Sequence, residues 1–213
     1  MNIALVMEWS TSERNAVVFE TLKKVAVAHG HTAVNYGQFD MEDARQTYNQ
    51  NAVFIAALLA GKAADFVVTG CGTGEGAMLA ANAMPGVICG LVVDPADSYL
   101  FTQVNGGNCM SLPFAKGWGW GAEVNLEYVF EKLFVKEPGG GYPAHAAESE
   151  KRNAYLLNQL KGASHHTLEE ILTTRDAEVK EIIKAAFAGR RMELYKEHCQ
   201  DKTLQALIEK EVS

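Results

Sequence analysis

The sequence predicts an α/β protein, a doubly wound three-layer sandwich with a five-stranded parallel sheet, plus an α-helical C-terminal extension. Five short segments that are apolar almost throughout alternate with helical segments, as is typical of parallel strands covered on both faces. The 213 residues are 48% hydrophobic and 21% charged, which is enough for a sizeable core and excludes a disordered chain. Beyond the glycine- and proline-rich segment 137–143 the strand signals stop.

Local signals place each element in chain order. The first strand is a compact apolar run, and the helix after it opens at Thr11-Ser12-Glu13 and ends at Gly30, a predicted C-cap. The third strand runs directly into a glycine-rich loop. Strands are expected at 2–7, 31–36, 65–69, 87–93 and 108–112, and helices at 11–30, 48–60, 77–82, 96–104 and 121–134.

The C-terminal part has a different composition. Residues 148–212 are rich in Lys, Glu, Leu and Ala, with apolar residues at intervals of three or four. We expect three helices that pack on the sandwich or on a second subunit, because short isolated helices are marginally stable in water. The predicted division is a Rossmann-like domain over residues 1–143 and a helical extension over residues 144–213.

Charge and cysteine usage narrow the function classes. A net charge of −7 and a pI near 5.4 make nucleic acid or an acidic membrane surface a poor partner, although a locally basic pocket for a small anion remains compatible. The N-terminus lacks the basic start of a signal peptide, and no apolar run reaches the roughly 18 residues of a membrane span. The cysteines form no CxxC pair. A cytoplasmic protein with reduced thiols is expected.

The outstanding motif is the loop Gly70-Cys71-Gly72-Thr73-Gly74-Glu75-Gly76. Glycines let the backbone approach a ligand and turn its N–H groups toward a phosphate or an oxyanion. No Lys-Ser or Lys-Thr follows, so the loop is not a Walker A motif. Two alternatives remain: a tight turn without a ligand, and a dinucleotide fingerprint formed by Gly72, Gly74 and Ala77 with Asp94 further on. Against the fingerprint, the motif follows the third strand and its helix is short.

This loop also carries reactive side chains. A thiol at a helix N-terminus, such as Cys71, has its thiolate stabilised by the helix dipole. A carboxylate in a cleft, such as Glu75, is pushed toward a pKa useful for a base. Thr73 lies between them. Ligands in doubly wound folds bind at the carboxyl ends of the strands, where this loop begins.

The run from Val67 to Gly76, followed by Ala80-Ala81-Asn82, resembles the signature of the sugar-phosphate isomerase family that contains ribose-5-phosphate isomerase B and the galactose-6-phosphate isomerase subunits. The resemblance covers about residues 1–145 and includes the start Met1-Asn2-Ile3-Ala4-Leu5, Gly30-His31 and the segment Asn105 to Asn108. The glycine loop with its cysteine is the specific match. The longer chain resembles a subgroup with a helical extension.

The resemblance implies an aldose–ketose isomerisation through an enediolate, with no metal or organic cofactor. A base removes the proton beside the carbonyl and returns it to the neighbouring carbon, while loop amides hold the oxyanion. In many members the loop cysteine is the base, and in others a Glu four residues later. This chain has both, and we favour Cys71 as base with Glu75 orienting it or the substrate; Thr73 would fix the base or a substrate oxygen. A homodimer or homotetramer with sites completed across the interface is implied as well.

Departures from the family pattern affect substrate binding. Glu8-Trp9-Ser10 stand where the family has Asp-His, and Val104 stands where a ring-opening His precedes Asn105. The Arg that follows the family's late glycine pair and grips the phosphate has no clear equivalent in Gly139 to Pro143, so Arg14, Lys151 and Arg152 are replacement candidates. The residues expected to contact the substrate are Glu8, Trp9, Ser10, Arg14, Tyr48, Gly72, Gly74, Gly76, Asn105 and Arg152.

The missing ring opener suggests a substrate hypothesis. The small-molecule partner is expected to be a sugar phosphate: ribose 5-phosphate, galactose 6-phosphate or a tetrose phosphate. A tetrose 4-phosphate has no hydroxyl able to close a furanose ring, so it needs no ring-opening group, whereas a different acid could open a pentose or hexose. A non-catalytic sugar-phosphate sensor and a dinucleotide-binding domain are the alternative functions.

Overall fold

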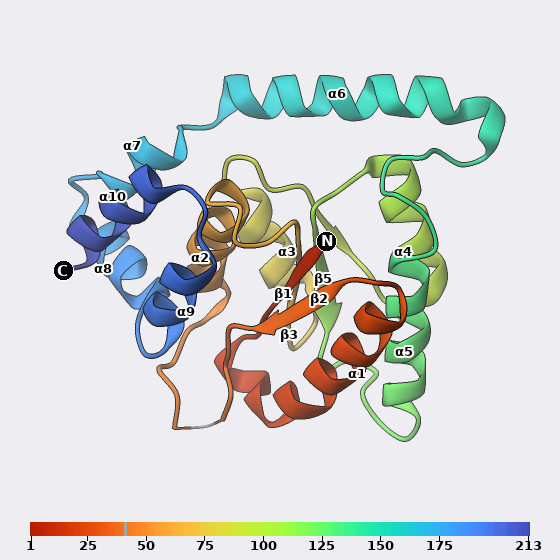
Figure 1. The fold of residues 1–213 in the computed structure, drawn as a ribbon, viewed down its shortest axis with the longest axis horizontal. Helices are drawn as coiled ribbons and strands as arrows, with labels where there is room; N and C mark the ends of the chain where they lie inside the picture. The colour runs from red at the N-terminus through yellow and green to blue at the C-terminus, as the bar shows by residue number, and fades with distance from the viewer. Residues whose placement is uncertain (41) are drawn as a thin grey trace.

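The computed structural model describes residues 1–40 and 42–213 (Figure 1). The strands form one five-stranded sheet in the order β2-β1-β3-β5-β4, and every neighbouring pair is parallel. This confirms the predicted doubly wound sheet. The strands are β1 (Asn2–Val6), β2 (Thr32–Asn35), β3 (Phe66–Cys71), β4 (Cys89–Leu91) and β5 (Cys109–Pro113).

Helices cover both faces of the sheet, and a separate hydrophobic cluster lies on each face. One cluster joins alternate residues of the central strands, such as Leu5 and Val68, to the helices α1 and α5. The other joins their neighbours, such as Ala4 and Val67, to α2 and α3. The helices of the sandwich are α1 (Asn15–Ala28), α2 (Tyr48–Ala60), α3 (Glu75–Asn82), α4 (Pro95–Leu100) and α5 (Ala122–Leu133).

Several boundaries differ from those predicted by sequence periodicity. A 3-10 helix, η1 (Trp9–Arg14), precedes α1, and the segment expected as one helix at 96–104 divides into α4 and a π-helix, η2 (Phe101–Asn105). β3 continues to Cys71, and α3 begins at Glu75, directly after Gly74 at φ +80°. The loop between strand and helix is therefore only three residues long.

The extension contains more helices than expected. We predicted three, but residues 144–213, all of which are described, form five α-helices after a short 3-10 helix, η3 (Ala144–Ala146). Local caps break the pattern: Thr167 and Glu170 form a capping box, and Asp176 and Asp201 accept hydrogen bonds from the first turns of the next helices. The helices are α6 (Ala147–Ser164), α7 (Leu168–Leu172), α8 (Ala177–Ala186), α9 (Arg191–His198) and α10 (Lys202–Val212).

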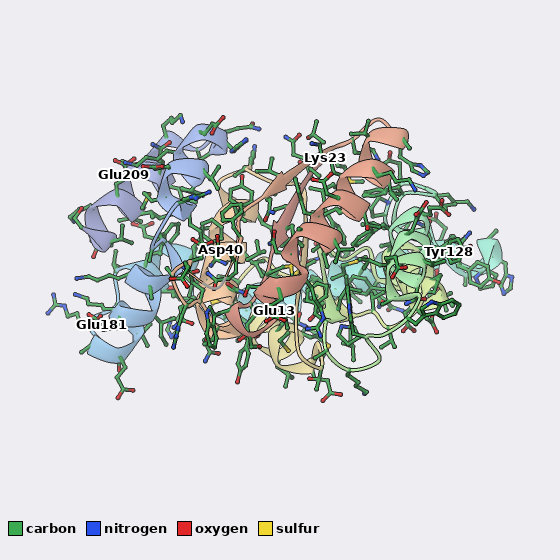
Figure 2. The ribbon with its side chains drawn as sticks, turned by 90° about the horizontal axis from the view of Figure 1, so that it is seen from below. Glu13, Lys23, Asp40, Tyr128, Glu181 and Glu209 are labelled. Atoms are coloured by element: carbon green, nitrogen blue, oxygen red, sulfur yellow. The ribbon has the colours of Figure 1, made fainter. Side chains whose placement is uncertain are left out.

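The extension shares the hydrophobic core of the sandwich. Phe54 of α2 makes edge-to-face or tilted ring contacts with Tyr36, Phe187 and Tyr195, and the last two belong to the extension. In Figure 1, α7 to α10 lie beside α2, whereas α6 crosses the molecule along the end where the strands begin. In Figure 2 the labelled Glu181 and Glu209 mark the extension at one end of the molecule, and Tyr128 of α5 lies at the other.

No helix among the described residues is long and apolar enough to cross a membrane.

Candidate active site at the carboxyl ends of β1 and β3

The strand order places the topological switch point of the sheet between β1 and β3. The chain leaves β1 through α1 toward β2 and then crosses through α2 to β3 on the other face, so the two connections diverge at this point. Open α/β sheets bind ligands at such a switch point, outside the carboxyl ends of the strands. Val6, the last residue of β1, pairs with Thr69, and Glu8 and Cys71 each lie two residues beyond these partners along their own segments. The predicted loop thus lies next to the end of β1.

The glycine loop is held in place through its carbonyl groups. The backbone N–H groups of Phe114 and Lys116 donate to the carbonyls of Cys71 (2.9 Å) and Gly72 (2.8 Å), and the buried Ser111 hydroxyl donates to the carbonyl of Gly74 (2.6 Å). All three donors come from β5 or from the segment after it. The loop is consequently fixed against its neighbouring strand end before any ligand binds.

In contrast to its carbonyl groups, the backbone N–H groups of the glycine loop remain available to donate hydrogen bonds to a ligand. Among the hydrogen bonds of the described residues, none is donated by the backbone N–H groups of Gly72, Thr73 or Gly74. They stand at the N-terminus of the eight-residue helix α3, whose dipole favours negative charge at this position. Preorganised N–H groups of this kind stabilise a developing oxyanion.

Two groups suited to proton transfer flank these amides. The Cys71 side chain is 6% exposed at the last residue of β3, and the Glu8 side chain is 7% exposed just beyond β1. The Ser10 hydroxyl donates a hydrogen bond to Glu8 Oε2, and no cation of the described residues forms an ion pair with this carboxylate. A buried thiol at the end of β3 and a buried carboxylate just beyond β1 thus belong to neighbouring strands of the sheet.

Glu75 and Thr73 occupy the outer part of the loop. Thr73 Oγ1 accepts a hydrogen bond from the backbone N–H of Glu75 (3.3 Å), which caps the first turn of α3. The Glu75 carboxylate is more than half exposed and lies 3.9 Å from the ammonium group of Lys116. The exposed Glu75 carboxylate thus differs in its surroundings from the buried thiol of Cys71.

Trp9 and Arg45 form a stacked pair at the rim. The Arg45 guanidinium lies 4.3 Å from the centre of the Trp9 ring, and the Trp9 backbone N–H donates to the carbonyl of Gln46 (2.9 Å). Arg45 is exposed and forms no ion pair with any described residue. The Trp9 indole N–H is buried without a hydrogen-bond partner. The Arg45 guanidinium is thus a donor accessible to an anionic, oxygen-rich ligand, whereas the Trp9 indole N–H is enclosed by the protein.

Two more predicted residues reach the same end of the sheet. Arg14, at the end of η1, lies 5.2 Å from the ring centre of Trp118, which follows β5. Tyr48, the first residue of α2, covers Gly76: a Cβ built there would lie 3.2 Å from the tyrosine ring. Arg14, Arg45 and Lys116 give this edge three cations on a chain whose net charge is −7.

The remaining predicted residues lie elsewhere in the chain. Asn105 ends η2 just before β5 begins, and Arg152 lies on the exposed helix α6, over the Tyr155 ring at 5.1 Å. Lys151 pairs with Glu148 at 3.2 Å on the same helix. These positions belong to the end of the sheet where the strands begin, opposite to the glycine loop, so within one chain they do not join Cys71.

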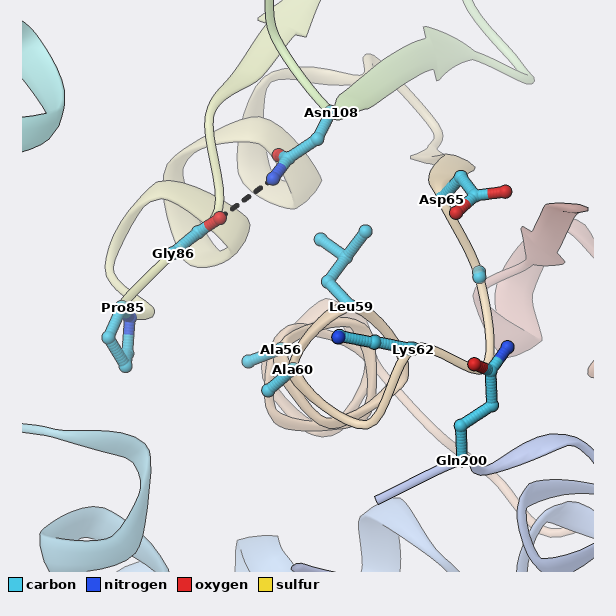
Figure 3. A pocket seen from close by; sticks show the side chains of 10 residues that line it. Ala56, Leu59, Ala60, Lys62, Asp65, Pro85, Gly86, Asn108 and Gln200 are labelled. Atoms are coloured by element: carbon cyan, nitrogen blue, oxygen red, sulfur yellow. Dashed lines mark hydrogen bonds between the residues drawn. The ribbon is translucent and has the colours of Figure 1, made fainter. Parts of the chain in front are cut away.

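A cavity also lies at that opposite end. Its volume is about 520 Å³, and it is bordered by Lys62, Asp65, Asn108 and Gln200 (Figure 3). Asp65 and Asn108 directly precede β3 and β5, and the Asn108 side chain donates to the carbonyl of Gly86 (2.7 Å). A smaller cavity of about 100 Å³, lined by Leu112, Lys116 and Trp118, lies at the carboxyl end of β5. The candidate active site is therefore identified by its reactive side chains and its unpaired loop amides, and not by the volume of a cavity.

Sequence inspection missed three residues at this edge: Arg45, Lys116 and Trp118. Arg45 ends the polar stretch between β2 and α2, and Lys116 and Trp118 follow β5 within five residues. The signal that identifies them is the rule that connections leaving the carboxyl ends of parallel strands meet at one edge. That rule applied to the segments after β2 and β5 would have found all three.

Comparison with protein families matches residues 3–138 to the family described as Ribose/Galactose Isomerase. This match covers more than half of the chain, including the glycine loop. The chain belongs to that family. The earlier resemblance is confirmed, and with it the chain's place among sugar-phosphate isomerases. Comparison with curated proteins gives no significant match.

Solved structures extend the likeness to the whole chain. A 4-deoxy-L-threo-5-hexosulose-uronate ketol-isomerase complexed with a tartrate is 44% identical, with a TM-score of 0.94, over 100% of this chain and 99% of the other. A ribose-5-phosphate isomerase from Vibrio parahaemolyticus is 41% identical, with a TM-score of 0.94, over 99% of both chains. Both neighbours are isomerases, and both include the helical extension. This member of the Ribose/Galactose Isomerase family is an isomerase.

Shorter relatives share only the fold. A ribose-5-phosphate isomerase from Thermotoga maritima is 21% identical, with a TM-score of 0.58, over 74% of this chain and 97% of the other. Its whole length matches only three quarters of this chain. The extension is consequently a feature of the long members.

Proposed function

We propose that the protein catalyses a cofactor-independent aldose–ketose isomerisation through an enediolate, with Cys71 as the base. The observation that carries the proposal is the buried thiol of Cys71 beside loop N–H groups that have no protein acceptor. A base and an oxyanion site at neighbouring positions are what proton abstraction next to a carbonyl requires.

In the proposed mechanism the Cys71 thiolate takes the proton from carbon 2 of the open-chain aldose. The electron pair moves into the bond between carbons 1 and 2, and the carbonyl oxygen becomes an oxyanion held by the amides of Gly72, Thr73 and Gly74. The thiol then returns the proton to carbon 1. Glu8 transfers the hydroxyl proton from oxygen 2 to oxygen 1, which leaves the ketose and the initial thiolate. Glu75 and Thr73 orient the substrate.

The cations at the rim support an anionic substrate. Arg45 and Arg14 are each held over an aromatic ring, which keeps a guanidinium in one place while its N–H groups remain available. Either a phosphate or a carboxylate at the far end of a sugar would be recognised by such donors. The phosphate-gripping arginine that the family carries elsewhere is therefore replaced, in this proposal, by Arg45.

The substrate we favour is an anionic aldose without a hydroxyl that can close a furanose or pyranose ring on its carbon-1 aldehyde. Val104 replaces the ring-opening His, and a tetrose 4-phosphate lacks the necessary hydroxyl. The compound in the name of the 44% identical relative also lacks such a hydroxyl, because a 4-deoxy-5-hexosulose carries no hydroxyl at carbon 4 and has a ketone in place of the hydroxyl at carbon 5. A uronate of this kind ends in a carboxylate, which Arg45 and Arg14 would bind. Ribose 5-phosphate and galactose 6-phosphate are the competing substrates.

A homodimer or homotetramer is part of the proposal. Tyr155, Leu156, Leu157 and Leu160 of α6 are all more than 40% exposed, which is unusual for four large apolar side chains on one helix. Asn105 and Arg152 lie at the same end of the molecule. A second copy seated there would cover the apolar face and bring these residues to another chain's site.

The decisive experiment is NMR in D₂O with a panel of open-chain and ring-forming substrates: erythrose 4-phosphate, ribose 5-phosphate, galactose 6-phosphate and 4-deoxy-L-threo-5-hexosulose uronate. We expect deuterium at the carbon next to the carbonyl, fastest with the uronate or the tetrose phosphate. Faster exchange with ribose 5-phosphate would contradict the ring-opening argument but keep the isomerase proposal. Binding of a sugar acid without exchange would favour the sensor, and tight binding of NAD would favour the dinucleotide-binding domain.

Arg45→Ala tests recognition of the anionic group. The loss of one charge-assisted contact should raise KM about tenfold, since such a bond contributes about 1.5 kcal/mol or more, while kcat changes less than threefold. Steady-state kinetics with the best substrate of the panel measures both. The matched control is Arg190→Ala, which removes an exposed guanidinium that lies 5.2 Å from the Phe39 ring instead. Equal KM values for the two variants would show that Arg45 does not bind the substrate.

A further inference from the structure

Arg191 of α9 is an arginine buried without a carboxylate partner. Its side chain is 2% exposed, lies 4.9 Å from the ring centre of Phe54, and forms no ion pair with any described residue. Burial lowers the pKa of Arg191 to about 9, and Asp43 acts in the opposite direction, so the group is charged at neutral pH. A buried charge is costly to a protein unless it is well satisfied.

The groups that satisfy it are backbone carbonyls at the ends of two strands. Arg191 Nε donates to the carbonyl of Tyr36 at 3.1 Å, and Nη2 donates to the carbonyl of Met7 at 3.4 Å. Met7 directly precedes Glu8, and its own N–H donates to the carbonyl of Gly37 at 2.7 Å. One guanidinium from the extension thus ties the ends of β1 and β2 together at the residue before the candidate acid.

A second connection from the extension reaches the segment that carries Arg45. The side-chain Nε2 of Gln46 donates to the carbonyls of Ala185 (3.1 Å) and Ala188 (3.3 Å), which lie at the end of α8 and just after it. The Gln46 carbonyl accepts the Trp9 N–H, and its side-chain oxygen accepts from Gln38. The rim pair of Trp9 and Arg45 is therefore fastened to the helices beyond residue 144.

We propose that Arg191 is a positioning residue for the isomerisation: by holding the carbonyls of Met7 and Tyr36, it fixes Glu8 and Trp9 relative to Cys71. The helical extension then helps to position the catalytic residues, in addition to packing against the sandwich. An apolar side chain would fill the same space without the cost of burying a charge, but it would leave the carbonyls of Met7 and Tyr36 without the donors that Arg191 supplies. The inference rests on the proposed function for its kinetic consequence, and on the hydrogen bonds of Arg191 for its geometry.

The experiment compares Arg191→Met with Arg191→Lys at a temperature at which both are folded, as circular dichroism verifies. Methionine keeps the length and removes the donors, whereas lysine keeps the charge and one donor direction. Because catalytic geometry tolerates little displacement, we expect kcat to fall at least tenfold in Arg191→Met and to recover in part in Arg191→Lys. Unchanged kcat in a folded Arg191→Met protein would overturn the proposal.

Ile208→Ala separates positioning from stability. Ile208 is completely buried in α10, which packs against α7 and α8 within the same extension. Its truncation should lower the Tm and leave kcat within twofold of the wild type. An equal loss of kcat in Ile208→Ala and Arg191→Met would assign the effect to general loosening and reject a specific role for Arg191.

A readout without activity distinguishes failure of this inference from failure of the proposed function. In ¹H–¹⁵N spectra we expect the amide of Trp9 and its unpartnered indole N–H to shift in Arg191→Met, with faster hydrogen exchange of that amide, and to be unchanged in Ile208→Ala. If the wild type isomerises no sugar while these signals behave as described, the function is wrong and the positioning of the strand end stands. If the signals do not move, the positioning itself is wrong.

Discussion

Cys71→Ala is expected to lower the kcat of isomerisation by a factor of about a thousand or more. A positioned general base contributes about 10²- to 10⁴-fold to a rate, and no described side chain other than Glu8 offers a second buried base at the switch point. Deuterium incorporation should fall by the same factor, because both measurements report removal of the proton from carbon 2. KM should change little, since the loop amides and the rim cations remain.

Glu75→Gln and Cys199→Ala are the control variants for Cys71→Ala. Glu75 is exposed beside Lys116, so Glu75→Gln should lower kcat by much less than Cys71→Ala. Cys199 is another buried thiol, bonded to the carbonyl of Gly61 at the far end of α2, and its replacement by alanine should leave kcat unchanged. Deuterium exchange that survives in Cys71→Ala and disappears in Glu75→Gln would assign the base to Glu75.

Gly70→Ala is expected to have the largest effect on stability, a loss of about 3 kcal/mol or more in the free energy of unfolding. A Cβ at this position would lie 2.2 Å from the carbonyl oxygen of Leu112 and 2.5 Å from the Phe114 ring. The oxygen belongs to the backbone of β5, so it can move only by separating two central strands. Urea unfolding followed by circular dichroism measures the change, and failure of the variant to fold would agree with it.

Gly72→Ala provides the control two residues away. A Cβ there would lie 3.7 Å from Ala115 Cβ, an ordinary contact, and Gly72 does not have a positive φ. We expect its free energy of unfolding to stay within about 1 kcal/mol of the wild type. Unfolding midpoints that agree between the two variants would show that β3 and β5 can separate at Gly70 without cost.

The fold and the reactive loop could be predicted from sequence because both depend on local patterns. Apolar runs such as 2–7 and 65–69 predict buried parallel strands wherever they occur, and Gly70 to Gly76 predict a close backbone approach whatever lies opposite. The same local signals were too weak to count the helices after residue 144. The caps at Thr167, Asp176 and Asp201 are short-range signals, but they lie within one continuous helical composition.

The sequence by itself determined the class of fold and the family resemblance, which were both confirmed, and it identified Cys71 between its glycines as the candidate base. Only the tertiary structure decided that β1, which leads into Glu8, pairs with β3, which ends at Cys71, that Arg45 stacks on Trp9, and that Arg191 holds the carbonyl of Met7 across 184 residues. Each of these pairings joins segments far apart in the chain. Strand register and side-chain packing determine such contacts. The residue pattern within one segment does not indicate which distant segment it will contact.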